Sequence, residues 1–216
     1  MVDIKVTAAR KRVGRRDVWS GLNCEFRKGA LHAVVGASGA GKSTLLRCVG
    51  LTDRLSAGQV SYDSVDLNAA SARERRQRRR ASVGFLFQDY ALMDFDTVRA
   101  NVAFVHGGKL SRRASDRLID GALEHVGLAG RGGERIHELN GAEKQRVALA
   151  RILVRDVEVV LADEPTGALD MKNAEMVVGI LSEYALAGAC VIIATHDPWV
   201  VSHADSCVDL DIYCPG

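Results

Sequence analysis

The sequence lacks the cysteine patterns that mark metal-binding or disulfide-stapled proteins. Its five cysteines are odd in number, and none of them forms a Cys-x-x-Cys pair. These absences argue against a zinc site, a thioredoxin-like site and a closed disulfide framework. We therefore expect a reduced, cytosolic protein.

Long apolar runs, internal repeats and low-complexity tracts are also missing. The first five residues contain no apolar signal core. The longest nearly apolar stretch, residues 184–194, falls far short of the roughly 20 residues that a membrane-spanning helix needs. We expect a chain that does not cross a membrane by itself. Its 216 residues, 47% of them apolar, are enough to bury a core as one domain.

Charge of either sign is not in large excess. The net charge is +2 and the isoelectric point is about 8.3, which is too mild to argue for a nucleic-acid partner. One basic run stands out, because residues 73–80 hold six arginines around one glutamate and one glutamine. No aromatic residue interleaves this run, so we interpret it as the solvated face of a helix near the membrane side. Contact with anionic lipid headgroups is a weaker alternative.

Short apolar segments alternate with helical patterns along the chain. The predicted strands are residues 2–6, 22–26, 30–35, 58–62, 83–87, 157–162 and, as a last buried strand, 190–194. Predicted helices cover residues 71–80, 142–155 and 177–184, and another begins at residue 42. This order predicts an α/β domain with a mostly parallel core sheet. Residues 1–88 and 156–216 would form the core lobe, and residues 89–155 an inserted helical lobe.

A glycine-rich loop follows the strand predicted at residues 30–35. It matches the pattern Gly-x-x-x-x-Gly-Lys-[Ser/Thr] with Gly36, Ala37, Ser38, Gly39, Ala40, Gly41, Lys42, Ser43 and Thr44. Glycines let successive N–H groups surround an anion, and the next helix points its positive end there. Lys42 would contact the β- and γ-phosphates and Ser43 would bind Mg²⁺. A glycine-rich turn with a surface lysine is the alternative, but the strand–loop–helix order favours nucleotide binding.

Two carboxylates follow the apolar strand at residues 157–162. Adjacent residues on a strand point to opposite sides, so Asp163 can hold Mg²⁺ through water while Glu164 faces the attacking water as general base. Such residues could equally be solvated turn residues. The phosphate loop, about 120 residues upstream, favours the functional interpretation.

Histidine gives a weaker signal. His196 follows the strand at residues 190–194, where a lone histidine is more often structural than catalytic. No role is assigned to the other five, which are His32, His106, His125, His137 and His203. Only the family resemblance sets His196 apart from them.

Five motifs stand in the order found in ABC ATPase domains. They are residues 36–44, the Phe87-Gln88 pair, and residues 139–143, 163–170 and 195–197. Over essentially its whole length the chain resembles this family, and it is most similar to the ATPases of lipoprotein-release, macrolide-efflux and bacteriocin-export systems. The resemblance implies a P-loop NTPase fold of the ABC type, with antiparallel N-terminal strands beside the parallel core sheet. It also implies ATP hydrolysis with ATP and Mg²⁺ bound.

The resemblance further implies a homodimer or heterodimer of ATPase subunits that sandwiches two ATP molecules. Gln88 would sense Mg²⁺ and the attacking water, His196 would contact the γ-phosphate, and Asp170 would couple the two sites. Residues 89–104 would receive a short cytoplasmic helix of a separate, membrane-spanning permease chain. The subunit would then be cytoplasmic and peripheral on the inner face of the cell membrane.

The signature segment departs from the family pattern Leu-Ser-Gly-Gly followed by Gln or Glu. Asn140 replaces the serine and Ala142 the second glycine, whereas Gly141 and Glu143 keep to the pattern. The resemblance places these four residues at the γ-phosphate of the opposite subunit. Asparagine can donate through its amide and can cap a helix, but Ala142 would be strained if its backbone needed a positive φ. We expect a slow but real ATPase.

A second departure concerns the aromatic residue that stacks on adenine in the family. Val13 stands near that position and offers no ring. Trp19 is the nearest aromatic residue, but its place in the pattern is typical of a core position. We therefore expect weak discrimination between ATP and GTP.

Two other functions stay open. A soluble ABC protein of translation or DNA repair would carry two ATPase domains or a long coiled-coil insertion, and this sequence has neither. A regulatory module that binds ATP with little hydrolysis is compatible with Asn140 and Ala142, but the intact Glu164 argues against it. Cargo and direction of transport cannot be predicted, because the membrane partner would contact the cargo.

Overall fold

The computed structural model describes residues 2–106 and 111–214, which form two compact units. Unit 1 comprises Met1–Phe85, Val157–Glu164 and Ile180–Gly216, and unit 2 comprises Leu86–Asp156 and Pro165–Gly179. Unit 1 contains both β-sheets apart from one strand end, and unit 2 contains most of the helices predicted for the middle of the chain.

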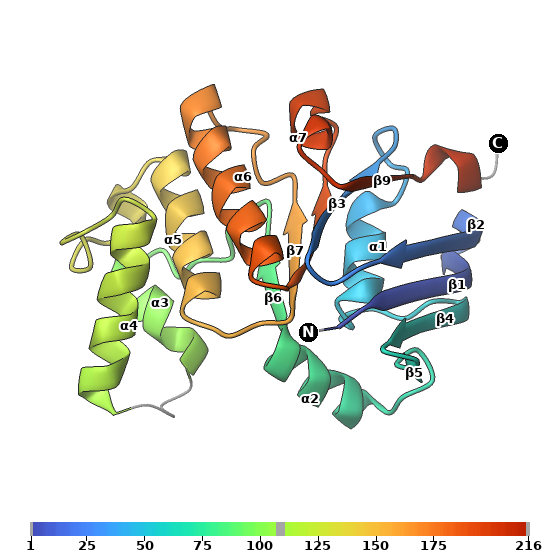
Figure 1. The fold of residues 1–216 in the computed structure, drawn as a ribbon, viewed down its shortest axis with the longest axis horizontal. Coiled ribbons are helices and arrows are strands. Elements are labelled where there is room, and N and C mark those ends of the chain that lie inside the picture. The colour runs from blue at the N-terminus through green and yellow to red at the C-terminus, as the bar shows by residue number, and fades with distance from the viewer. Residues whose placement is uncertain (1, 107–110, 215–216) are drawn as a thin grey trace. The chain divides into compact units, whose positions relative to one another are not determined.

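The N-terminal part of unit 1 contains an antiparallel sheet of four strands. Its strands, in the order β2-β1-β4-β5, are Arg16–Phe26, Ile4–Val13, Ala57–Tyr62 and Val65–Asp66. The side chains of Ile4 and Val6 are buried, and Lys5 between them is exposed, because successive strand residues face opposite sides of the sheet. The predicted antiparallel N-terminal strands are therefore confirmed (Figure 1).

The second sheet has five strands in the order β6-β7-β8-β3-β9. Their bounds are Val83–Leu86, Val159–Asp163, Cys190–Ala194, Ala30–Val35 and Ser206–Asp209. Parallel pairing joins β7 to β8, β8 to β3 and β3 to β9. All five residues of β8 are buried, as expected of a central strand covered on both faces. The predicted α/β class with a mostly parallel core sheet is confirmed.

The prediction of residues 190–194 as a last buried strand agrees with the structure, because the strand that follows it, β9, has no buried residue. β9 itself was not predicted; it lies at the edge of the sheet beside β3. Its four residues are mostly exposed, so they lack the apolar run that identified the other core strands.

Helices of unit 1 flank its strands. α1 (Lys42–Val49) packs against β7 and β8. α2 (Ala72–Ser82) begins at the predicted N-cap Ser71, whose side chain accepts from the N–H of Glu74 in a capping box. α7 (Pro198–Ser202) and the short 3₁₀ helix η3 (Asp211–Tyr213) follow β8 and β9. α6 (Met171–Leu186) contributes residues to both units.

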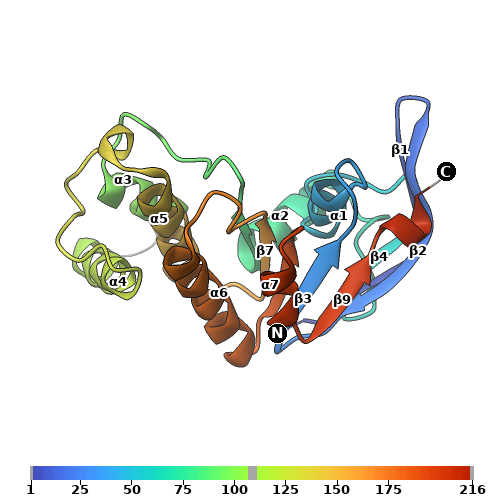
Figure 2. The same ribbon diagram turned by 90° about the horizontal axis from the view of Figure 1, so that it is seen from above.

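Unit 2 is helical. Its elements are α3 (Val98–Ala103), η1 (Phe104–His106), α4 (Arg112–His125), η2 (Ile136–Glu138) and α5 (Gly141–Leu153). α3, α4 and α5 pack against one another (Figure 2). The unit also includes Pro165–Gly179, the segment that contains the start of α6.

The five cysteines differ in burial: Cys48 and Cys190 are buried, Cys24 and Cys214 are half-buried and Cys207 is exposed, and all five are free thiols. Within residues 2–106 and 111–214, no helix has both the length and the apolar character needed to span a bilayer.

Candidate nucleotide-binding site

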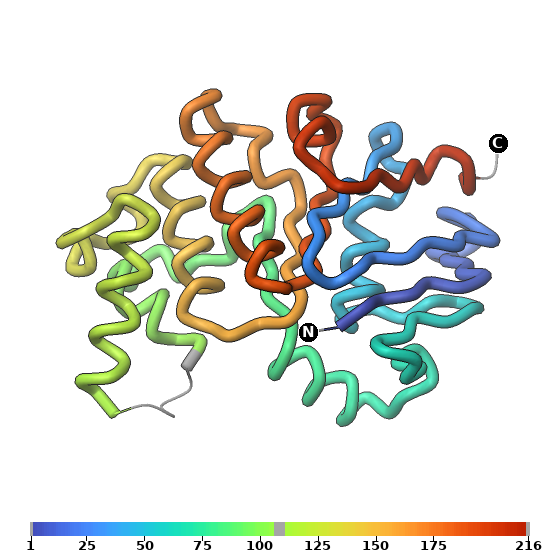
Figure 3. Tube along the Cα trace, viewed as in Figure 1, coloured from blue at the N-terminus to red at the C-terminus, as the bar shows by residue number. Residues whose placement is uncertain are grey.

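The glycine loop joins β3 to α1 through a tight turn (Figures 1 and 3). Gly36, Gly39 and Gly41 have φ angles of 144°, 84° and 90°, which side chains disfavour. A Cβ at Gly41 would lie 2.4 Å from Val18 Cγ1 and 2.7 Å from Trp19 Nε1. Glycine at position 41 is therefore required both by the backbone conformation and by the close approach of β2.

The N-terminus of α1 faces the loop without a side-chain cap. Its N-cap residue is Gly41, and no side chain there accepts a hydrogen bond. The first N–H groups of a helix have no partner within the helix, so they favour an anion at this end. Lys42 Nζ lies across the loop and donates to the carbonyl of Gly36 at 2.8 Å. Amide groups and an ammonium group are thus gathered where a phosphate chain would bind.

Ser43 and Asp163 provide two oxygen ligands suited to Mg²⁺. The Ser43 hydroxyl donates to Asp163 Oδ1 at 3.0 Å, which joins the start of α1 to the end of β7. Burial raises the pKa of the Asp163 carboxyl, and the hydrogen bond from Ser43 opposes that rise. Hydroxyl and carboxylate oxygens are ligands that Mg²⁺ prefers, so the residues present fit the predicted cation.

Glu164 lies one residue beyond β7 in left-handed backbone, with φ of 47°. Its N–H donates to the carbonyl of Ala194 at 2.9 Å. The direction of the Glu164 side chain is therefore set by this turn and not by the alternation of side chains along a strand. The sequence argument from strand alternation was wrong for this residue. A non-glycine residue held in this conformation is often found at a functional site.

Glu164 and His196 come together at the ends of neighbouring strands. Glu164 Oε1 lies 2.9 Å from His196 Nδ1. Glu164 Oε2 is buried and has no hydrogen-bond partner among the residues that the structure describes, while the His196 side chain is 72% exposed. A buried carboxylate oxygen without a partner can accept a hydrogen bond from a water molecule. The pair can thus hold a water and orient the carboxylate that would take its proton.

The signature segment lies in unit 2, at the start of α5. Asn140 is the N-cap residue, and its Oδ1 accepts from the N–H of Glu143 at 2.9 Å. The Glu143 carboxylate in turn accepts a hydrogen bond from the N–H of Asn140, and it also accepts one from the Arg131 guanidinium at 2.6 Å. The bonds from Arg131 and Asn140 lower the pKa of the Glu143 carboxyl. The predicted capping role of Asn140 is confirmed. Ala142 lies in helical backbone, so the strain considered for it does not arise.

Gln88 and Asp170 also belong to unit 2. Gln88 is exposed in the turn that follows β6. Asp170 precedes α6, and its Oδ1 accepts from the backbone N–H and the side-chain amide of Asn173 at 2.9 and 2.8 Å. These bonds lower the pKa of the Asp170 carboxyl. Both side chains stay exposed, as residues that meet a ligand or partner must be.

The residues considered for adenine lie in unit 1. Val13, at the end of β1, is 60% exposed, whereas Trp19 is fully buried. Trp19 packs beside Gly41, and its indole Nε1 has no hydrogen-bond partner. The interpretation of Trp19 as a core residue is confirmed, and the structure offers no exposed ring at residue 13 or 19.

Sequence reasoning missed two residues that shape the site. Both carboxylate oxygens of Asp211 accept from the N–H of Ala37 at 3.0 Å, and no sequence pattern links residues 174 positions apart. In unit 2, buried Gln145 donates to the carbonyl of Pro165 at 2.8 Å, next to Glu164 in the chain. A glutamine among the apolar positions of α5 was the signal that could have identified it.

Comparison with known proteins agrees with this geometry. Residues 19–167 match the family model described as ABC transporter. The chain is 41% identical over 197 residues to the macrolide export ATP-binding/permease protein MacB 1/2 of Paracoccus denitrificans, covering 89% of this chain and 29% of that protein. It is 37% identical over 188 residues to the ABC transporter ATP-binding protein YvrO of Bacillus subtilis, covering 87% and 82%.

A solved structure shows the same fold. It is titled as the dimeric structure of a post-hydrolysis state of the ATP-binding cassette MJ0796 bound to ADP and Pi. It matches with a TM-score of 0.87 and 28% identity, over 95% of this chain and 93% of that chain. Our chain thus spans 29% of the macrolide-export relative but nearly all of the cassette. With its glycine loop and acidic pair, the chain belongs to the ABC transporter family as an ATP-binding and ATP-hydrolysing cassette.

Proposed function

We propose that this cassette powers a membrane-spanning permease through MgATP hydrolysis in an ATP-dependent dimer, at the inner face of the cell membrane. The observation that carries the proposal is the group around Glu164, whose Oε1 lies 2.9 Å from His196 Nδ1 and whose buried Oε2 has no hydrogen-bond partner among the described residues. The MJ0796 dimer bound to ADP and Pi, together with the export relatives, supports it.

Each site residue of unit 1 has a separate role in ATP hydrolysis. The loop N–H groups and Lys42 bind the phosphates. Ser43 would hold Mg²⁺ directly and Asp163 would hold it through water, and the cation would supply positive charge to the phosphates. Glu164 accepts the proton of the attacking water as that water's oxygen bonds to the γ-phosphorus and the bond from the γ-phosphorus to the ADP oxygen breaks. His196 holds the Glu164 carboxylate in place and contacts the γ-phosphate.

The residues of unit 2 act on the same nucleotide and on the partner cassette. Gln88 contacts Mg²⁺ and the attacking water, and Asp170 couples the two sites. Asn140 donates its amide to the γ-phosphate of the opposing ATP. Because Asn140 Oδ1 is engaged in the cap, the Nδ2 group is the part left to donate.

The permease would dock on residues 89–104 of unit 2. Phe95 is 81% exposed and Phe104 is 67% exposed, and Asp94 and Asp96 flank Phe95 with exposed side chains. Exposed aromatic residues near charged ones are typical of protein interfaces. This surface supports a partner helix that carries apolar and basic side chains.

Replacing Glu164 tests the hydrolytic assignment. E164Q keeps the shape of the side chain but removes the base, so it should bind ATP and lose at least about a hundredfold in hydrolysis. It should also accumulate an ATP-bound dimer in sizing chromatography, whereas K42A should weaken ATP binding itself. E124Q, on the exposed face of α4, is the matched control. Normal hydrolysis by E164Q would contradict the assignment.

A further inference from the structure

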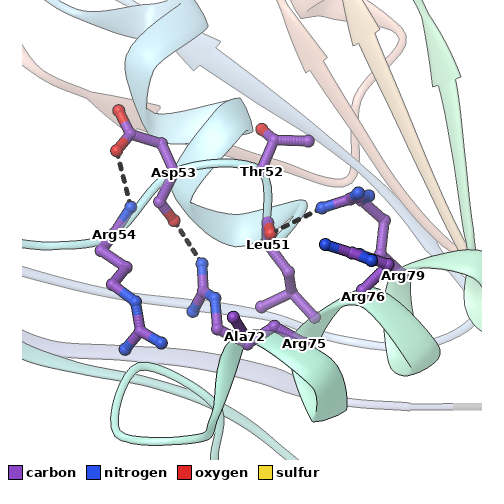
Figure 4. A pocket seen from close by; sticks show the side chains of 8 residues that line it. All are labelled: Leu51, Thr52, Asp53, Arg54, Ala72, Arg75, Arg76 and Arg79. Atoms are coloured by element: carbon purple, nitrogen blue, oxygen red, sulfur yellow. Dashed lines mark hydrogen bonds between the residues drawn. The ribbon is translucent and has the colours of Figure 1, made fainter.

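A cationic pocket lies in unit 1, outside the glycine loop. It has a volume of about 390 Å³. The loop after α1 and one face of α2 form it together (Figure 4). Its lining residues are Leu51, Thr52, Asp53, Arg54, Ala72, Arg75, Arg76 and Arg79.

The face of α2 that lines the pocket is directed toward the protein, and most helices carry apolar side chains on such a face. Residues 72, 75, 76 and 79 have the spacing i, i+3, i+4, i+7, which places them on one side of a helix. Three of these four are arginine, and Arg75 is only 5% exposed. The basic run is therefore not simply a solvated face, as the sequence suggested, because part of it points into the protein.

Within the described part of the chain, the guanidinium groups of Arg75 and Arg79 meet backbone carbonyls and no carboxylate. Arg75 donates to the carbonyls of Leu67 and Asp53, and Arg79 donates to the carbonyl of Leu51. Figure 4 shows these side chains reaching from α2 toward the loop. Carbonyl groups satisfy the N–H donors but leave the positive charge uncompensated.

Among the described residues, the remaining two arginines of the pocket also have no carboxylate partner. Arg54 donates to the carbonyls of Asn68 and Ala70. Among the described residues, Arg76 has no hydrogen-bond or ion-pair partner. By contrast, Arg78 on another face of α2 pairs with the Glu158 carboxylate at 2.8 Å.

Asp53 is the one acidic residue that lines the pocket, and it is already paired. Its Oδ2 lies 2.8 Å from Lys11 Nζ. Burial raises the pKa of its carboxyl, but the bond from Lys11 and the nearby charges outweigh this effect, so the pKa is lowered. The pKa of Arg75 is lowered by burial and by the charges of Arg54 and Arg79. The pocket thus holds mutually repelling cations.

We propose that this pocket binds a phosphate-bearing anion. The guanidinium fork matches the oxygens of a phosphate group and is the common recognition group for it. The volume admits a phosphorylated small molecule or a phospholipid headgroup, since ligand pockets start at about 300 Å³. An anion here would relieve the repulsion among the four arginines, which carbonyl groups cannot do.

A binding experiment separates the two sources of phosphate. The protein is first saturated with MgADP, so that the glycine loop is filled. Glycerol 3-phosphate is then titrated calorimetrically, and vesicles of phosphatidylglycerol in phosphatidylcholine are compared with pure phosphatidylcholine by co-sedimentation. R76Q/R79Q should weaken binding about tenfold or more. R73Q changes the same charge on the same helix outside the pocket and should leave binding unchanged.

Each outcome decides the proposal. Saturable binding of glycerol 3-phosphate that R76Q/R79Q weakens supports a soluble ligand, and the same pattern with anionic vesicles alone supports a lipid headgroup. Failure of both probes, or an equal loss in R73Q, overturns the proposal. R76Q by itself guards against misfolding of the double variant, because the Arg76 side chain makes no hydrogen bond or ion pair with the residues that the structure describes. Thermal unfolding confirms that each variant is folded.

Discussion

Asn140 shows how one side chain can keep local structure while altering chemistry. Its Oδ1 caps α5 by accepting from the N–H of Glu143, as a serine hydroxyl would. Its longer side chain moves the remaining donor away from the place where a serine hydroxyl would present it. The substitution therefore costs little in helix stability and can still slow hydrolysis.

We predict that N140S raises the ATPase rate of the assembled complex. Realigning one charge-assisted hydrogen bond is worth about 1.5–3 kcal/mol, which corresponds to roughly ten- to a hundredfold in rate. A142G should add nothing and should lower the free energy of unfolding by about 0.5–1 kcal/mol, because residue 142 is helical. Steady-state rates of both single variants and the double variant test this. An unchanged or lower rate in N140S would contradict it.

Base recognition is also decided at single residues. Val13 is exposed without a ring and Trp19 is fully buried, so neither residue can stack on the base, a contact worth about 1–3 kcal/mol by analogy with single-stranded nucleic acids. We predict that ATP and GTP compete with similar affinity and that V13Y strengthens ATP binding. Competition binding measures both. A strong preference of the unmodified chain for ATP would require an aromatic residue from elsewhere.

At the scale of elements, the glycine loop depends on β2 as well as on its own residues. Val18 and Trp19 from β2 occupy the space that a side chain at Gly41 would need. Asp211, the first residue of η3, accepts a hydrogen bond from the N–H of Ala37. The loop is therefore held from two sides by elements distant in sequence, and its shape is set before a phosphate arrives.

Two alanine variants separate backbone strain from overlap in this loop. Gly39 and Gly41 both have positive φ, but only a side chain at Gly41 would overlap its neighbours. G39A should cost about 1 kcal/mol of unfolding free energy. G41A should cost at least about 2 kcal/mol more, through overpacking. Urea unfolding without nucleotide gives both values, and equal losses would show that the neighbours yield easily.

At the scale of the whole molecule, we expect the cassette to transmit the energy of ATP hydrolysis to its membrane partner through the exposed surface at residues 89–104. Asp94 contributes its backbone carbonyl to His137 within unit 2, so its carboxylate remains at the surface. Phe95, beside it, contacts the ring of His137. The fold thus holds Asp94 by its backbone carbonyl, while the carboxylate of Asp94 and most of the Phe95 ring stay exposed.

We predict that D94K/D96K weakens association with the membrane partner. Co-expression with the permease should bring the unmodified chain to the membrane fraction, and the double charge reversal should reduce that amount several-fold, since like charges across an interface are costly. ATP binding by the isolated chain should not change. E124K on α4 serves as the control. A complex that survives both reversals would place the interface elsewhere.

The sequence by itself determined the features that depend on neighbouring residues. The glycine loop, the N-caps Ser71 and Asn140, and most core strands follow from local spacing and alternation, because turns, caps and strand faces are set within a few residues. The edge strand β9 escaped this reasoning, since its exposed residues lack an apolar pattern.

Only the tertiary structure decided which distant side chains meet. It joined Ser43 to Asp163, Glu164 to His196 and Ala37 to Asp211. It also turned part of the arginine run into a pocket. The physical reason is that strand order and helix packing choose these partners through the burial of apolar surface over the whole core, and that information is spread along the chain.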